Sequence, residues 1–85
     1  MPLQTNERAQ LLVLERVDRD RRMARYYVLA IEPTLFDEVS LTREWGRFGA
    51  RPSRRVELHA DADAARIALD TWLRRKRRRG YFART

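Results

Sequence analysis

The segment Arg43-Glu44-Trp45-Gly46-Arg47-Phe48-Gly49 interleaves two arginines with a tryptophan and ends at a glycine. Side chains alternate faces along an extended strand, so Arg43, Trp45 and Arg47 are expected to project together. Guanidinium groups pair with phosphate oxygens and an indole stacks on a base or ribose, so this face suits a sugar-phosphate backbone. Gly46 lacks a β-carbon and is expected to permit close approach of another backbone or a ligand. The alternative is that the tryptophan anchors a core and the arginines are simply solvated.

Length and composition predict one small domain. The chain has 85 residues, of which 44% are hydrophobic, and a chain of this size buries only a modest core. We expect a loose N-terminus over residues 1–8 and a folded core over residues 9–82, all within a single domain spanning 1–85. The lack of cysteine excludes disulfides and thiolate metal sites, and His59 cannot hold a metal alone. We therefore expect no metal and no cofactor.

The charge is distributed unevenly along the chain. Residues 1–72 contain as many arginines as acidic residues, 12 of each, so the entire net charge of +7 follows Trp72. This asymmetry is typical of a segment that binds a polyanion, although cations at the end of a helix also complement its dipole. The N-terminus has no apolar run of signal-peptide length. We expect a cytoplasmic, bacterial protein that is monomeric and has no membrane partner, with association with the nucleoid as one option.

Hydrophobic periodicity predicts four strands followed by one helix. The strands are expected at Ala9–Val17, Arg25–Glu32, Ser40–Phe48 and Arg54–His59, and the first two should form a hairpin. The helix is expected over Asp61–Arg79. The resulting fold class is α+β, a small antiparallel β-sheet of about four strands with one long C-terminal helix packed on a face.

Several side chains are expected to build the core. In the helix, a stripe at three- and four-residue spacing should cover the sheet, and Lys76 continues this stripe. Val56 and Leu58 are expected to point inwards, and Phe36 is expected to anchor the loop before the third strand. Gly80 should end the helix in a left-handed conformation, after which the chain can fold back on the core through Tyr81 and Phe82. The stripe comprises Ala62, Ala65, Leu69, Trp72 and Leu73.

These residues resemble a known family, the WGR domain, which occurs in DNA-break-activated poly(ADP-ribose) polymerases and in bacterial proteins. Trp45-Gly46-Arg47 matches its namesake motif. The supporting features are the tyrosine-led strand at Tyr26-Tyr27-Val28-Leu29, the continuation Phe48-Gly49, Ala65 in the helix, and Lys76 before Gly80-Tyr81. The resemblance covers Tyr26 to Tyr81, and the short form looks like the bacterial single-domain version.

The resemblance implies an antiparallel sheet with a packed helix and a binding role. In the polymerases this module holds the terminal nucleotide at a DNA break. Carried over, Trp45 would pack on the terminal sugar or base and Arg47 would hold the nearby phosphate. Two positions depart from the family pattern, since Pro52 stands where a second glycine is common and Ala24 where break-binding members have an asparagine.

No nucleophile and base are recognisable, and the three glycines do not fit a phosphate-binding loop, so we expect neither an enzyme nor a small-molecule substrate. We expect a nucleic-acid-binding module, for double-stranded DNA rather than RNA, with DNA ends as the candidate ligand. The alternative is an adaptor that docks an acidic protein or another copy of itself, because tryptophan and arginine also dominate protein interfaces. The candidate nucleic-acid-binding residues are Arg43, Trp45, Arg47, Arg51, Arg54, Arg55, Arg74, Arg75 and Arg78.

Overall fold

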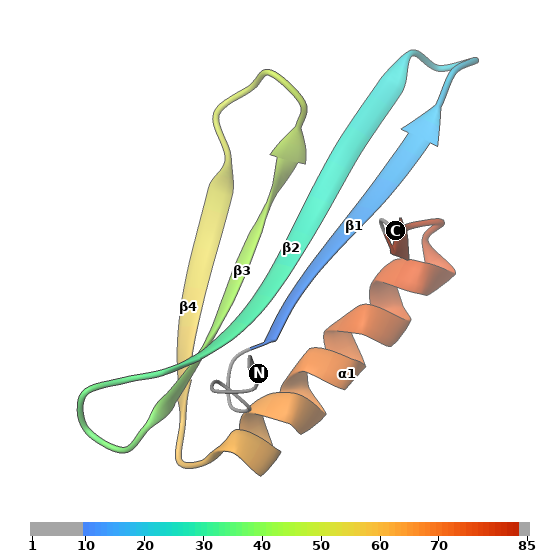
Figure 1. Ribbon diagram of the computed structural model, residues 1–85. Helices are drawn as coiled ribbons and strands as arrows, with labels where there is room; N and C mark the ends of the chain where they lie inside the picture. The colour runs from blue at the N-terminus through green and yellow to red at the C-terminus, as the bar shows by residue number, and fades with distance from the viewer. Residues whose placement is uncertain (1–9, 84–85) are drawn as a thin grey trace, which may run out of the picture.

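A computed structural model describes residues 10–83, which form one antiparallel sheet covered on one face by a single helix (Figure 1). The sheet has five strands in the order β4-β3-β2-β1-β5. The α+β prediction is confirmed, and the expected loose N-terminus at 1–8 lies outside the described residues. The elements are β1 (Gln10–Asp18), β2 (Met23–Pro33), β3 (Val39–Arg47), β4 (Ser53–His59), α1 (Ala62–Arg78) and β5 (Phe82–Ala83).

The hairpin of β1 and β2 forms the centre of the sheet. Alternating β-branched, leucine and tyrosine side chains favour both strands, and a turn at residues 19–22 sets their register. Leu14 pairs with Tyr27, and Tyr27 pairs with Trp45 on the next strand. Both Leu14 and Tyr27 are almost completely buried. β2 is therefore the middle strand, and β3, which carries the Trp-Gly-Arg motif, lies beside it.

The helix α1 begins and ends as its sequence predicts. The carboxylate of Asp61 accepts a hydrogen bond of 2.8 Å from the Ala64 amide, which satisfies one of the free amides at the helix start. At the other end, Gly80 adopts a φ of +94° and the Tyr81 amide donates to the Lys76 carbonyl at 3.0 Å. This cap turns the chain back to the sheet, where β5 pairs with β1.

The hydrophobic core lies between α1 and one face of the sheet. Ala65 and Leu69 are buried in it, Trp72 and Leu73 pack against it, and Tyr81 folds back on it with only 7% exposure. The helix stripe predicted from the sequence is thus confirmed. Within residues 10–83, no helix is long and apolar enough to cross a membrane.

Four expected core residues are exposed. Val56 and Leu58 were expected to point inwards, but they are 55% and 59% exposed. Val56 pairs with Thr42, one position away from the core residue Leu41, so it lies on the sheet face that α1 does not cover. Phe36 in the β2–β3 loop is 78% exposed, and Phe82 is 72% exposed because it pairs with Glu15 on the open face. A single helix covers one face only, which is why alternation alone misplaced these side chains.

Charge is segregated between the two ends of the sheet. The β1–β2 turn, the β3–β4 loop and the C-terminus of α1 lie at one end, and the β2–β3 loop and the N-terminus of α1 lie at the other (Figure 1). The first end carries the arginines of the turn and the basic helix terminus, with Asp18 and Asp20 as its acidic residues. The second end carries Asp37, Glu38 and Asp61. An anionic ligand is therefore attracted to the end where the Trp-Gly-Arg motif finishes β3.

Candidate nucleic-acid interface

Three arginines form a row across neighbouring strands at the basic end. Arg16 on β1 pairs directly with Arg25 on β2, and Arg25 pairs with Arg47 on β3. Alternation along each strand places the row on the same sheet face as Tyr27 and the helix. Like charges directly opposite each other on adjacent strands destabilise a sheet. Such a row is therefore expected where an anion binds rather than where stability alone matters.

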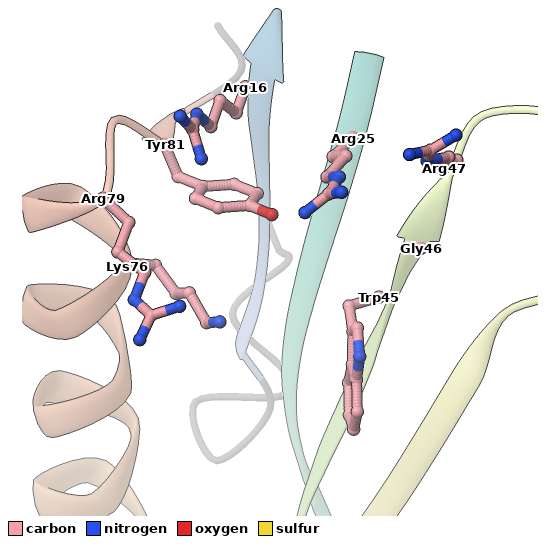
Figure 2. Close-up of a pocket in the computed structure, with 8 residues that line it drawn as sticks. All are labelled: Arg16, Arg25, Trp45, Gly46, Arg47, Lys76, Arg79 and Tyr81. Carbon is pink, nitrogen blue, oxygen red and sulfur yellow. The ribbon is translucent and has the colours of Figure 1, made fainter. Parts of the chain in front are cut away.

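The row forms one wall of a pocket of about 290 Å³. Figure 2 shows side chains from β1, β2, β3 and α1 converging on this space. Its lining contains five cationic side chains and no acidic residue. None of the ion pairs among residues 10–83 involves any of these five cations. The lining residues are Arg16, Arg25, Trp45, Gly46, Arg47, Lys76, Arg79 and Tyr81.

The indole of Trp45 lies at the edge of this pocket, half-buried. Its ring stacks on that of Tyr27, with centroids 5.7 Å apart and an interplanar angle of 18°. Tyr27 in turn stacks on Trp72 of α1, at 6.4 Å and 25°. The two readings left open by the sequence both hold in part, since Trp45 packs against the core and also lines the pocket. Its orientation is therefore fixed by aromatic stacking.

Arg43 lies on the predicted face but not in the pocket. It is only 8% exposed, and its guanidinium carbon lies 3.8 Å from the centroid of Trp72 and 5.5 Å from that of Trp45. Its Nη1 donates to the Tyr27 hydroxyl at 3.1 Å, and its Nη2 lies 3.6 Å from a carboxylate oxygen of Glu57. Arg43 is therefore a flat cation held between aromatic rings, where it supports Trp45 from behind.

Lys76 is the cation that α1 contributes to the pocket. Its Nζ lies 4.4 Å from the centroid of the Tyr27 ring and 5.6 Å from that of Tyr81. Burial lowers the pKa of Lys76, and the positive charges of Arg79 and Arg43 lower it further. An anion in the pocket would reverse these electrostatic effects and favour the charged ammonium.

The other predicted residues surround the pocket without lining it. Arg51 is exposed in the β3–β4 loop, and its carbonyl oxygen lies 3.7 Å from the place that a β-carbon on Gly46 would take. Arg55 pairs with Arg43 on the helix-covered face, whereas Arg54 lies on the open face. Arg75 caps Trp72 at 4.9 Å from the ring centroid. Arg74 and Arg78 are exposed on the last turns of α1. Of the candidates named from the sequence, the structure brings Trp45 and Arg47 together in the pocket.

Sequence reasoning did not select Arg16, Arg25 or Arg79 as site residues. The signal for Arg16 and Arg25 lies in the hairpin register, because they are symmetrically placed about the turn at residues 19–22. Arg25 also lies two residues before Tyr27 on the same strand, so the two side chains share a face of the sheet. Arg79 comes three residues after Lys76, which continues the helix stripe, and residues three apart are neighbours on one helix face.

Comparison with known proteins identifies the family. The WGR domain model matches residues 10–85, so the chain belongs to the WGR family. In poly(ADP-ribose) polymerases this domain is a nucleic-acid-binding module. The resemblance inferred from the Trp-Gly-Arg motif and its flanking elements is thereby confirmed.

One curated relative is an uncharacterized protein, y4dW, of Sinorhizobium fredii (strain NBRC 101917 / NGR234). It is 48% identical over 71 residues, which cover 82% of this chain and 34% of the relative. The chain thus spans about a third of the length of this relative. No solved structure matches the chain significantly.

Proposed function

We propose that this WGR domain binds double-stranded DNA, preferring its ends, through the pocket at the basic end of the sheet. The row formed by Arg16, Arg25 and Arg47 carries this proposal. Three like charges in register, with no carboxylate partner among the described residues, create a strong attraction for phosphate. The domain is proposed to act as a monomer in the cytoplasm, in contact with the nucleoid.

The pocket's shape supports a preference for ends. Trp45 is held by stacking at the pocket edge, beside the arginine row. A terminal nucleotide can present both an unstacked sugar or base face to an indole and a phosphate to arginines, whereas interior nucleotides are stacked on both sides. In this proposal Trp45 packs on the terminal sugar or base, and Arg47 and Arg25 hold the adjoining phosphate.

The surrounding arginines contribute affinity without sequence preference. The basic last turns of α1 and the loop residue Arg51 flank the pocket, so they can contact phosphates further along the duplex. The exposed candidates Arg74, Arg75 and Arg78 are assigned to this role. Arg55, which lies on the edge strand β4, is assigned a weaker role. Arg43 acts by positioning Trp45, and Arg54, on the open face, is left out of the proposed interface.

The test is a fluorescence-anisotropy titration with a short blunt duplex and with a closed dumbbell of the same sequence. Wild-type protein should bind the open duplex more tightly, and Arg47→Ala should lose most of this difference. The matched control is Arg66→Ala, which removes an exposed arginine that pairs with Asp63 near the start of α1. Equal binding to both DNAs, unchanged in Arg47→Ala, would contradict end recognition through the pocket.

A second candidate function is an adaptor that docks an acidic protein or another copy of itself, and the exposed apolar side chains on the open face favour the second of these. Leu11, Val56, Leu58 and Phe82 are all more than half exposed. Sizing of the protein over a range of concentrations, compared with its retention on heparin, separates the two candidates. A monomer that is strongly retained on heparin supports nucleic-acid binding.

A further inference from the structure

The positive charge of the pocket is larger in magnitude than the negative charge of the phosphate group proposed to bind there. Five cations line about 290 Å³: Arg16, Arg25, Arg47, Lys76 and Arg79. A backbone phosphodiester carries a single negative charge, and a terminal phosphate monoester carries roughly −1.5 to −2. Neither neutralises the lining. The ligand that matches the site carries several negative charges within a small volume.

The positions of the cations support a ligand with more than one phosphate. Arg16, Arg25 and Arg47 lie in register across three strands, so the Cα atoms of neighbouring arginines are separated by the spacing of adjacent strands, roughly 5 Å. Lys76 and Arg79 face this row from the helix (Figure 2). A chain of two or three phosphates can contact both walls at once, because each phosphoryl group presents oxygens in different directions.

The pocket also has features suited to a nucleoside. Trp45 and Tyr81 both line it, and Trp45 is fixed by its stack on Tyr27. Base stacking on an aromatic side chain tolerates any base, so no particular nucleobase is specified. The cavity is close to roughly 300 Å³, the lower limit of small-molecule sites. It can therefore enclose the phosphates and leave the base at the edge.

We propose that this pocket binds free nucleoside diphosphates and triphosphates, which compete there with nucleic acid. The proposal rests on the proposed function in that both ligands use the same cations and Trp45. It goes beyond the sequence-based expectation, which included no small-molecule ligand. Affinity is expected to rise from the monophosphate to the triphosphate, and a rise in the nucleotide concentration would release the domain from DNA.

The first experiment is isothermal titration calorimetry of the full chain with AMP, ADP, ATP and inorganic tripolyphosphate, at low salt with EDTA. ATP should bind at least about tenfold more tightly than AMP, since it adds charge-assisted contacts to the lining. Tripolyphosphate should bind at least about fivefold more weakly than ATP does, because it lacks a base to stack on Trp45. Saturating Mg²⁺ should weaken ATP binding, because the metal neutralises part of the phosphate charge. Equal affinities for AMP and ATP would overturn the proposal.

Variants distinguish the pocket from general charge attraction. The double variant Arg16→Gln/Arg79→Gln should weaken ATP binding by about tenfold or more, whereas the double variant Arg19→Gln/Arg66→Gln, which removes the same charge outside the pocket, should have little effect. Similar losses in both variants would overturn the proposal. Circular dichroism of each variant confirms that it is folded.

Competition separates this proposal from the proposed function. ATP should displace a labelled blunt duplex from the wild-type protein, with a midpoint that agrees with its calorimetric affinity. If the duplex binds through Arg47 but ATP neither binds nor competes, only the nucleotide proposal fails. If ATP binds as expected but the open duplex binds no better than the dumbbell, the end-binding function fails and the nucleotide site stands.

Discussion

The guanidinium of Arg43 packs flat against Trp72, with its central carbon 3.8 Å from the ring centroid. This contact joins β3 to α1 just beneath the pocket and is continued by the stack of Tyr27 on Trp45. The buried Nε of Arg43 makes no hydrogen bond among the described residues. Arg43 does not line the pocket, so we expect it to affect binding through structure rather than by touching the ligand.

Arg43→Ala is expected to destabilise the domain by about 3 kcal/mol, because it opens a cavity beneath two aromatic rings and removes a buried charge from its partners. The free energy of unfolding from urea denaturation measures this loss. The matched control is Arg47→Ala on the same strand and face, which should change stability by no more than about 0.5 kcal/mol since Arg47 is exposed. Equal losses in both variants would contradict the buried position of Arg43.

The two faces of the sheet differ in what they contribute to stability. Leu41 is completely buried on β3, and Leu58 is 59% exposed on β4. Leu41→Ala is therefore expected to cost about 2–5 kcal/mol, whereas Leu58→Ala should cost less than about 1 kcal/mol. Thermal unfolding followed by circular dichroism compares them. A large loss in Leu58→Ala would indicate that another surface covers the open face in solution.

Two glycines near the site are expected to respond differently to substitution by alanine. Gly80 has a φ of +94°, so Gly80→Ala should cost about 1 kcal/mol through backbone strain at the helix cap. A β-carbon on Gly46 would lie 3.5 Å from the Tyr26 hydroxyl and 3.6 Å from the Pro52 Cα, which are ordinary contacts. Gly46→Ala is thus expected to fold with nearly unchanged stability. Denaturation of both variants tests this contrast. A loss of stability in Gly46→Ala but not in Gly80→Ala would contradict it.

The order of the elements could be predicted from the sequence because each has a strong local signal. Tyr26 to Ile31 is an uninterrupted apolar run rich in β-formers, Asp61 caps the helix, and Gly80 ends it. The direction of Val56 was not predictable in this way, since alternation divides a strand into two faces without saying which one a helix covers.

The pocket was harder to predict than the fold, because it depends on contacts between distant parts of the chain. Arg43 and Arg47 have the same parity and the same residue type, yet one is buried and the other exposed. What separates them is Trp72, which lies far away in sequence and covers Arg43 only after α1 has packed. The arginine row likewise appears only when the register of β1, β2 and β3 is known.

Salt dependence should reveal how many cations contact DNA. If about five phosphates are neutralised, the logarithm of the affinity should fall with the logarithm of the salt concentration at a slope near −4 to −5. Arg47→Ala should reduce the magnitude of this slope by about 1, and Arg66→Ala should leave it unchanged. Anisotropy titrations between about 50 and 200 mM salt measure the slope. A shallow slope that neither variant changes would count against a phosphate-binding pocket.

Binding should also be coupled to protonation of Lys76. Burial, with the charges of Arg79 and Arg43, lowers the pKa of this lysine in the free protein. A phosphate beside its ammonium favours the charged form and raises the pKa again, so the complex takes up a proton in the alkaline range between these two pKa values. By linkage, affinity for a blunt duplex should be constant below this range and should fall as pH rises through the lowered pKa of the free protein.

Titration calorimetry in two buffers of different ionisation enthalpy measures this proton uptake, which should approach about one proton per complex at most. Lys76→Arg keeps the positive charge but removes the titration in this range, so it should still bind DNA while the uptake disappears. Since Lys76 is the only lysine in the chain, no other lysine can contribute to the signal. Proton uptake that persists unchanged in Lys76→Arg would show that another group is responsible, and it would contradict the coupling of binding to protonation of Lys76.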